Sequence, residues 1–203
     1  MVKALIFDVG GVLVDLDMQA SIDAYRDILG YDITSMLDPS HQKGMYKLLE
    51  EGAVTADEFR DYILQGSRPG SEPGMVDRCM GALLVGTNPE TAALVNELSE
   101  SFDLYILSNN NPISMPLCRD VMARAGIDCD KVFKRQFVSS EMKVLKPSAE
   151  MFQRVIETIG LPPSELLFID DSLANVEAAA RHGIGVLHYV QGTSLRDALS
   201  GVI

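Results

Sequence analysis

The chain has 203 residues, of which 47% are hydrophobic and 23% are charged, a composition typical of a soluble globular protein with a sizeable core. Its 29 acidic and 17 basic residues give a net charge of −12 without any cluster of basic residues. We therefore predict no nucleic-acid partner. The sequence has no uncharged apolar run of about 18 residues, so we predict no membrane span and no membrane partner.

Cysteine usage and the first residues predict a cytoplasmic location. Cys79, Cys118 and Cys129 are odd in number and lack metal-ligand spacing, which favours free thiols in a reducing compartment. Residues 1–4 lead directly into a predicted strand and do not have the layout of a secretory signal.

The first predicted strand is the apolar run at residues 5–7, which ends at Asp8 and is followed by Gly10 and Gly11. Such a short, bounded run is typical of a buried strand, and glycines allow a tight turn and close approach of a ligand. Open α/β sheets bind ligands at the carboxyl ends of their strands. Asp8 is therefore a candidate nucleophile or metal ligand, or an ordinary residue that caps a turn.

Residues 18–85 contain helix signals and no predicted strand. Thr55 and Glu58 have the spacing of a capping box, and Phe59, Tyr62 and Ile63 then lie on one helix face. A second helix is expected at about 41–51, and the Gly- and Pro-rich residues 66–74 are expected to form a loop. This stretch therefore resembles a helical insertion.

From residue 86 onward, predicted helices and strands alternate. Apolar runs predict strands at 104–107, 132–138, 166–169 and 186–190. Helices are expected from Asn88-Pro89, from Asn111-Pro112, after Pro147, at 174–182 and after Ser194. Together with the first strand, this alternation predicts an α/β fold with a doubly wound, parallel five-stranded sheet.

The predicted sheet brings polar residues from several strand ends to one edge. Asp170 and Asp171 follow the most apolar strand, where two adjacent carboxylates repel each other and lose hydration. A divalent cation such as Mg²⁺ relieves both costs, and the pair could instead cap the next helix. Both can hold at once, with one carboxylate on the metal and the other on the helix.

Three further residues are candidates for binding an anion at the same edge. Ser108 and Asn109 lie between a predicted strand and a helix, where hydroxyl, amide and free N–H groups can bind an anion. Taken alone, this pair is also a plain helix cap. Lys146 precedes Pro147, and its ammonium could neutralise phosphate and carboxylates or simply be solvated.

With these segments in this order, the chain resembles the haloacid dehalogenase-like (HAD) superfamily. The matching residues are Asp8 for the nucleophile of the first motif, Ser108 for the second, Lys146 for the third, and Asp170 and Asp171, with Asn175, for the acidic fourth. Residues 51–59 resemble the cap of the branch that holds sugar-1-phosphate phosphatases and the N-terminal phosphatase domain of soluble epoxide hydrolases.

The resemblance implies a Rossmann-like core at 1–16 and 86–203 and a small helical cap at 17–85. It implies Mg²⁺-dependent hydrolysis of a small phosphorylated metabolite, sugar-phosphate-like, through an aspartyl-phosphate on Asp8. The implied catalytic residues are Asp8, Ser108 and Lys146. The implied substrate-binding residues are Ser108, Asn109 and Lys146, and the implied metal ligands are Asp8, the Gly10 carbonyl, Asp171 and, directly or through another ligand, Asp170.

One position departs from the family pattern. Most family phosphatases have a second aspartate two positions after the nucleophile, where it protonates the leaving group; here that residue is Gly10. Asp15, Asp17 or a residue of the cap could supply the acid instead. Two alternatives follow from Gly10: a metal-independent haloacid dehalogenase, whose halide leaves without a proton, or a catalytically impaired binding or regulatory protein.

Overall fold

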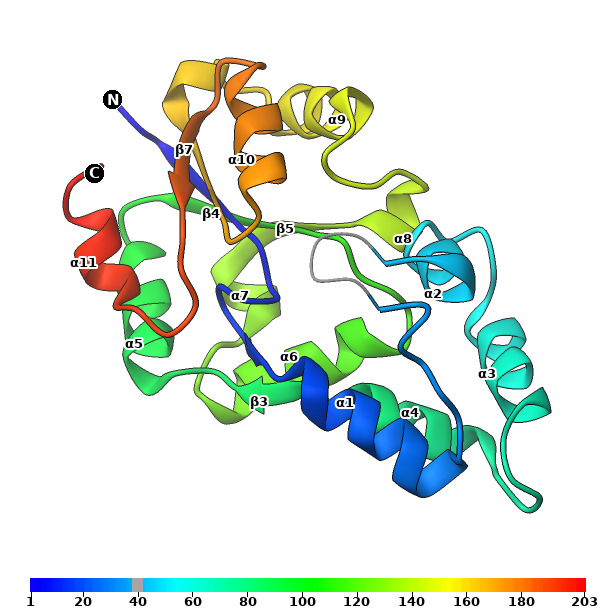
Figure 1. Ribbon diagram of the computed structural model, residues 1–203. Coiled ribbons are helices and arrows are strands. Elements are labelled where there is room, and N and C mark those ends of the chain that lie inside the picture. Colours follow the sequence, from blue (N-terminus) through cyan, green and yellow to red (C-terminus); the bar gives the residue numbers. More distant parts are fainter. Residues whose placement is uncertain (38–41) are drawn as a thin grey trace.

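The structure is a computed structural model that describes residues 1–37 and 42–203. Its centre is a five-stranded sheet in the order β5-β4-β1-β6-β7, with every neighbouring pair parallel (Figure 1). The predicted fold class is confirmed. The strands are β1 (Ala4–Phe7), β4 (Asp103–Ser108), β5 (Phe133–Val138), β6 (Leu166–Asp170) and β7 (Gly185–His188).

Helices cover both faces of the sheet, because successive side chains of each strand point to opposite sides. Leu5 and Phe7 of β1 belong to one apolar cluster, and Ala4 and Ile6 to another. On the first face lie α5 (Pro89–Leu98), α6 (Ser114–Arg124), α7 (Cys129–Val132) and α11 (Leu195–Leu199). On the second lie α9 (Ala149–Ile159) and α10 (Leu173–Ala180), with the short helices α8 (Ser139–Met142) and η2 (Pro163–Glu165) nearby in the chain.

A group of helices between β1 and α5 forms a layer of its own beside the sheet (Figure 1). It has a separate apolar cluster, which includes Tyr25, Leu49, Phe59 and Met80. The predicted capping box is present, with the Glu58 N–H donating to Thr55 Oγ1 at 3.2 Å. The helices are α1 (Met18–Ala24), which continues as the π-helix η1 (Tyr25–Leu29), then α2 (Gly44–Glu50), α3 (Ala56–Gln65) and α4 (Pro73–Gly81).

Several predicted boundaries differ from the observed ones. The helix expected at 41–51 is described from Gly44, and residue 41 lies outside the described residues. The loop expected at 66–74 ends earlier, because Pro73 begins α4, a position that tolerates proline. Helix α6 begins at Ser114, whose N–H donates to Asn111 Oδ1 at 2.9 Å.

A short antiparallel pair of strands, β2 (Asp15–Leu16) and β3 (Leu84–Gly86), joins the two ends of the helical layer. The prediction that residues 18–85 hold no strand was wrong at Leu84 and Val85, because a three-residue strand such as β3 is too short to show a period. Gln191, after β7, accepts from the Leu16 N–H at 3.2 Å and donates to the Leu16 carbonyl at 3.1 Å. The chain is therefore fastened to the sheet where it enters the helical layer.

Two predictions from the sequence concern the cysteines and membrane-spanning helices. Cys79, Cys118 and Cys129 are free and buried, as expected. Among the described residues, no helix is both long and apolar enough to cross a membrane.

Candidate active site

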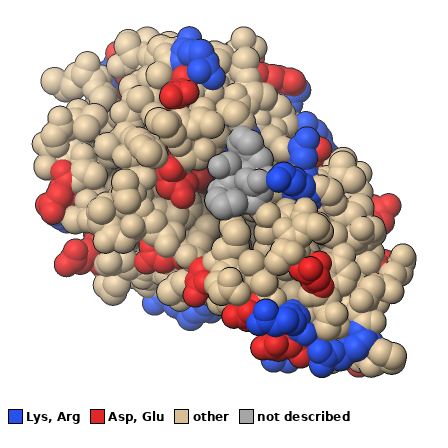
Figure 2. Space-filling view, in the orientation of Figure 1, with Lys and Arg blue, Asp and Glu red and all other residues tan. Residues whose placement is uncertain are grey.

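The carboxyl ends of β1, β4 and β6 meet at one edge of the sheet, as the sequence predicted. A cavity of about 730 Å³ lies over this edge and is closed on another side by α2. Figure 2 shows acidic side chains at the hollow in this face and basic side chains in the region of α2. On the side of the sheet edge, the cavity is lined by Asp8, Gly10, Ser108, Asn109, Lys146 and Asp171, and on the side of α2 by Tyr46, Lys47 and Glu50.

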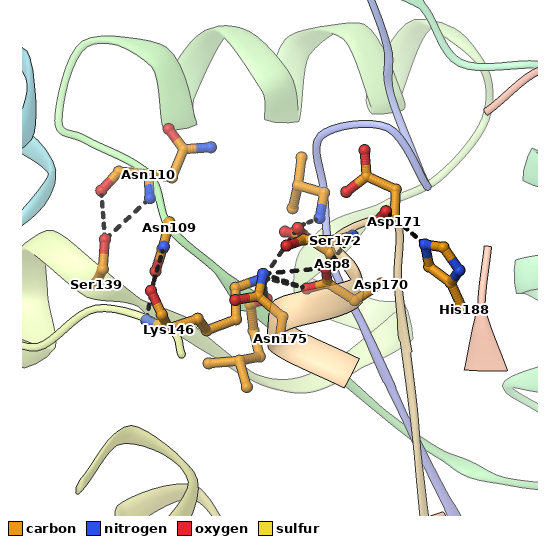
Figure 3. A network of polar contacts seen from close by, with 12 residues as sticks. Asp8, Asn109, Asn110, Ser139, Lys146, Asp170, Asp171, Ser172, Asn175 and His188 are labelled. Atoms are coloured by element: carbon orange, nitrogen blue, oxygen red, sulfur yellow. Dashed lines mark hydrogen bonds and ion pairs between the residues drawn. The ribbon is translucent and has the colours of Figure 1, made fainter. Parts of the chain in front are cut away.

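Lys146 lies at the centre of the polar network, completely buried (Figure 3). Its Nζ lies 2.9 Å from Asp8 Oδ2 and 2.7 Å from Asp170 Oδ2, and it donates to the Leu107 carbonyl at 2.9 Å. An ammonium has three donors, and all three have partners here. Burial draws the pKa of Lys146 down, but Asp170 and Asp8 outweigh burial and hold it above its usual value. The lysine therefore stays charged.

Asn109 holds the backbone of Lys146. Its Nδ2 donates to the Lys146 carbonyl at 2.9 Å, and its Oδ1 accepts from the Lys146 N–H at 2.8 Å. Ser108, next to it at the end of β4, is buried and lines the cavity. The contacts of Asn109 are those of a positioning residue. Contact of Asn109, Ser108 and Lys146 with substrate stays a prediction.

The two adjacent aspartates at the end of β6 point to different places (Figure 3). Asp170 is buried, and its Oδ1 accepts from the Ser172 N–H at 2.8 Å and from Asn175 Nδ2 at 3.0 Å. Asp171 lines the cavity, and its carboxylate lies where a side chain on Gly11 would be, since a Cβ there would be 2.2 Å from Asp171 Oδ2. One aspartate thus serves the helix start and Lys146, and the other faces the cavity.

The three carboxylates form a cluster whose oxygens lie close enough together for a divalent cation. Asp8, Asp170 and Asp171 each offer an oxygen, and these atoms lie within 4.8 Å of one another. Burial raises the pKa of Asp8 to about 7, with Lys146 opposing and Asp170 adding to the shift, and burial and Asp170 raise that of Asp171. Oxygen donors in such a crowded acidic group fit Mg²⁺, whose charge offsets the repulsion.

Gly10 supplies no side-chain acid at the position two residues after Asp8. A Cβ on Gly10 would lie 2.9 Å from Leu16 Cδ1, so an apolar side chain borders that position. Asp17 caps α1 by accepting from the Ala20 N–H at 3.0 Å, and within the described residues neither Asp17 nor Asp15 lines the cavity.

Glu50, at the end of α2, is a cavity residue that the sequence interpretation missed. Burial raises the pKa of Glu50 to about 8, and the negative charge of Asp8 adds to this effect. Its carboxylate has no hydrogen bond or ion pair with any other residue that the structure describes. The sequence signal was weak, because a glutamate at a helix end is most often solvated.

The fold and the site define an α/β enzyme whose central strand ends at a carboxylate paired with a buried lysine. The family model of the haloacid dehalogenase-like hydrolases matches residues 2–183, and the chain belongs to this family. The predicted superfamily is thereby confirmed.

Individual relatives support this assignment over the full length. The chain is 30% identical to a D-ribitol-5-phosphate phosphatase of Bacteroides thetaiotaomicron, over 100% of this chain and 99% of the relative. It is similar to a HAD family enzyme from the same organism, solved with magnesium and inorganic phosphate, with a TM-score of 0.89, 29% identity, and coverage of 97% and 98% of the two chains. It is also 24% identical to an (S)-2-haloacid dehalogenase of Burkholderia cepacia, over 91% and 81%.

Proposed function

We propose that the protein is a Mg²⁺-dependent phosphatase of small, sugar-phosphate-like phosphomonoesters that works through an aspartyl-phosphate on Asp8. The arrangement of Asp8, Lys146, Asp170 and Asp171 over one cavity is the observation that carries the proposal. The full-length similarity to a sugar-alcohol phosphatase supports the substrate class.

Asp8 is the nucleophile of the proposed reaction. Its carboxylate oxygen forms a bond to phosphorus, the bond from phosphorus to the ester oxygen breaks, and the alcohol leaves with a proton. Water then attacks phosphorus, releases inorganic phosphate and restores Asp8. Lys146 holds the Asp8 carboxylate at 2.9 Å and compensates its charge throughout.

Mg²⁺ would be held by Asp8, Asp171 and the Gly10 carbonyl, and by Asp170 either directly or through a shared ligand. When bound, Mg²⁺ offsets the negative charge of the phosphoryl group. We further propose that residues 17–85 form the cap of the site and residues 1–16 and 86–203 its core. Helix α2 then closes the cavity over the substrate and excludes water.

A second candidate activity is haloacid dehalogenation. Gly10 favours it, since a halide leaves without a proton, and the similarity to a haloacid dehalogenase agrees with it. That reaction needs no metal, so it does not account for the cluster of carboxylate oxygens from Asp8, Asp170 and Asp171. We therefore place it second.

The test is a screen of sugar and polyol phosphates with Mg²⁺ and with EDTA, together with 2-haloacids. We expect phosphate release that needs Mg²⁺ and that Asp8→Asn abolishes without loss of the folded circular dichroism spectrum. Release of chloride in EDTA would favour the dehalogenase. A well-folded protein that turns over neither class would support a binding or regulatory protein.

A further inference from the structure

We propose that Glu50 is the general acid and base of the reaction and replaces the carboxylate missing at position 10. This inference rests on the proposed phosphatase function. Its basis is the juxtaposition, across one cavity, of Asp8 on the sheet and a carboxyl group on α2 that has no partner among the described residues.

The reaction needs a proton donor because the leaving group is an alkoxide. General acid–base help of this kind contributes roughly 10²- to 10⁴-fold. Gly10 has no side chain, and Leu16 borders the space where one would begin. The donor therefore has to come from another wall of the cavity.

Among the described carboxyl groups that line the cavity, Glu50 is the one without another task. Asp8 is the nucleophile, and Asp171 lies with Asp8 and Asp170 in the cluster that fits a cation. Glu51 pairs with Lys47 at 3.3 Å. Glu50 has no hydrogen bond or ion pair with the rest of the described chain.

Hydrogen bonds to the backbone at Glu50 and just after it hold the end of α2 in place. Its carbonyl accepts from Ser139 Oγ at 2.6 Å, and the same hydroxyl contacts the backbone of Asn110, accepting from its N–H at 3.0 Å. Two residues further on, Lys143 Nζ donates to the Gly52 carbonyl. The end of α2 is thereby tied to the loop after β4 that carries Asn109 and Asn110.

The surroundings of Glu50 keep its proton at neutral pH. Burial raises its pKa to about 8; the charges of Asp8 and Glu51 act in the same direction, and Lys146 opposes them. Tyr46, one turn back on α2, is also buried against this end of the cavity. An acid with a pKa near the working pH serves both as donor and as acceptor.

The proton balance closes over the two steps. In the first, the Glu50 proton passes to the ester oxygen as its bond to phosphorus breaks, which leaves Glu50 ionised. In the second, Glu50 takes a proton from water as the water oxygen attacks the aspartyl-phosphate. Glu50 ends protonated, and no other reactant is needed.

The test compares Glu50→Gln with the matched control Glu51→Gln under single-turnover conditions with Mg²⁺. For a polyol phosphate, we expect Glu50→Gln to slow alcohol release by about 10²-fold or more. For p-nitrophenyl phosphate, whose leaving group needs little protonation, the first step stays within about tenfold of wild type. With substrate in excess over enzyme, slow hydrolysis of the intermediate then gives a burst of p-nitrophenolate. Glu51→Gln stays within about twofold of wild type on both substrates.

Two outcomes overturn the role of Glu50 without touching the proposed function. One is a wild-type rate of alcohol release in Glu50→Gln, and the other is an equal slowing of the first step with both substrates, as expected for a purely structural role. A wild-type protein that hydrolyses no phosphomonoester would instead overturn the phosphatase proposal itself.

Discussion

The side-chain amide of Asn109 closes a pair of hydrogen bonds with the backbone of Lys146, at 2.8 and 2.9 Å. The lysine in turn contacts the two carboxylates that end β1 and β6. The loop after β4 therefore determines where the ammonium lies beneath the cavity.

Asn109→Ala should lower both stability and activity, because both hydrogen bonds are lost and the Lys146 backbone groups are left without partners. We expect a loss of about 2 kcal/mol in the free energy of unfolding and a fall in kcat. Asn96→Ala is the control, since Asn96 Nδ2 also donates to two carbonyls, of Ala92 and Gly126, away from the cavity. Equal kcat values for the two variants, measured beside urea unfolding, would contradict the positioning role.

Gly52→Ala should loosen α2 from the sheet. Gly52 has a φ of +62°, and a Cβ there would lie 2.1 Å from the Ser140 carbonyl oxygen, so backbone has to move. Gly160→Ala is the control, because Gly160 has a φ of +74° and open space around it. The control should lose about 1 kcal/mol from backbone strain alone, and Gly52→Ala clearly more, together with a higher KM. Similar losses in the two variants would argue against a close contact at Gly52.

Glu50→Gln should stabilise the metal-free protein at alkaline pH. The folded protein holds the Glu50 proton up to about pH 8, whereas the group ionises near 4.5 when unfolded. The folded state therefore binds more protons between these values, and wild-type stability falls as the pH rises through that window. Relative to wild type, the variant should gain roughly 1–3 kcal/mol at pH 8, discounted for water in the cavity, and little at pH 4.

Urea unfolding in EDTA at the two pH values measures this difference. Glu51→Gln serves as the control for removing a charged side chain from the same helix end, and it should not reproduce the gain of Glu50→Gln at pH 8. A gain in Glu50→Gln that is the same at both pH values would contradict the assigned burial of the carboxyl group.

Asp171→Asn should change stability in opposite directions with and without Mg²⁺. Without metal, burial and Asp170 disfavour the charged form of Asp171, so the neutral amide should melt at the same or a higher temperature than wild type. With Mg²⁺, the wild type gains stability from binding and the variant gains less. Melting curves with EDTA and with millimolar Mg²⁺ check this, with the exposed Asp120→Asn as control. A full Mg²⁺ shift in Asp171→Asn would remove Asp171 from the metal site.

The sheet and the meeting of its strand ends could be predicted because both depend on local patterns. The run before Asp8 and the run before Asp170 are apolar throughout, since both faces of the sheet are covered. Parallel pairing then places their carboxyl ends at one edge. The strands β2 and β3 could not be predicted in this way, because their pairing joins residues at the two ends of a long insertion.

The roles of individual polar residues depended on packing that no local pattern records. Asn109 was interpreted as a helix cap or anion ligand, and its partner in the structure is the backbone of a residue on another loop. Glu50 was not singled out at all, because its half-buried place at the cavity depends on how α2 packs near Ser139. In both cases a residue distant in sequence decides what the side chain does.

Because Lys146 is buried, its chemical labelling can report on local opening of the protein. The other six lysines, at positions 3, 43, 47, 131, 134 and 143, are exposed, whereas Lys146 is buried at the base of the cavity. Brief treatment with an amine-reactive label should therefore modify those six and spare Lys146. Mass spectrometry then measures the labelled fraction of the peptide that contains Lys146. That fraction reports how often the strand ends separate, and the measurement needs no engineered tag.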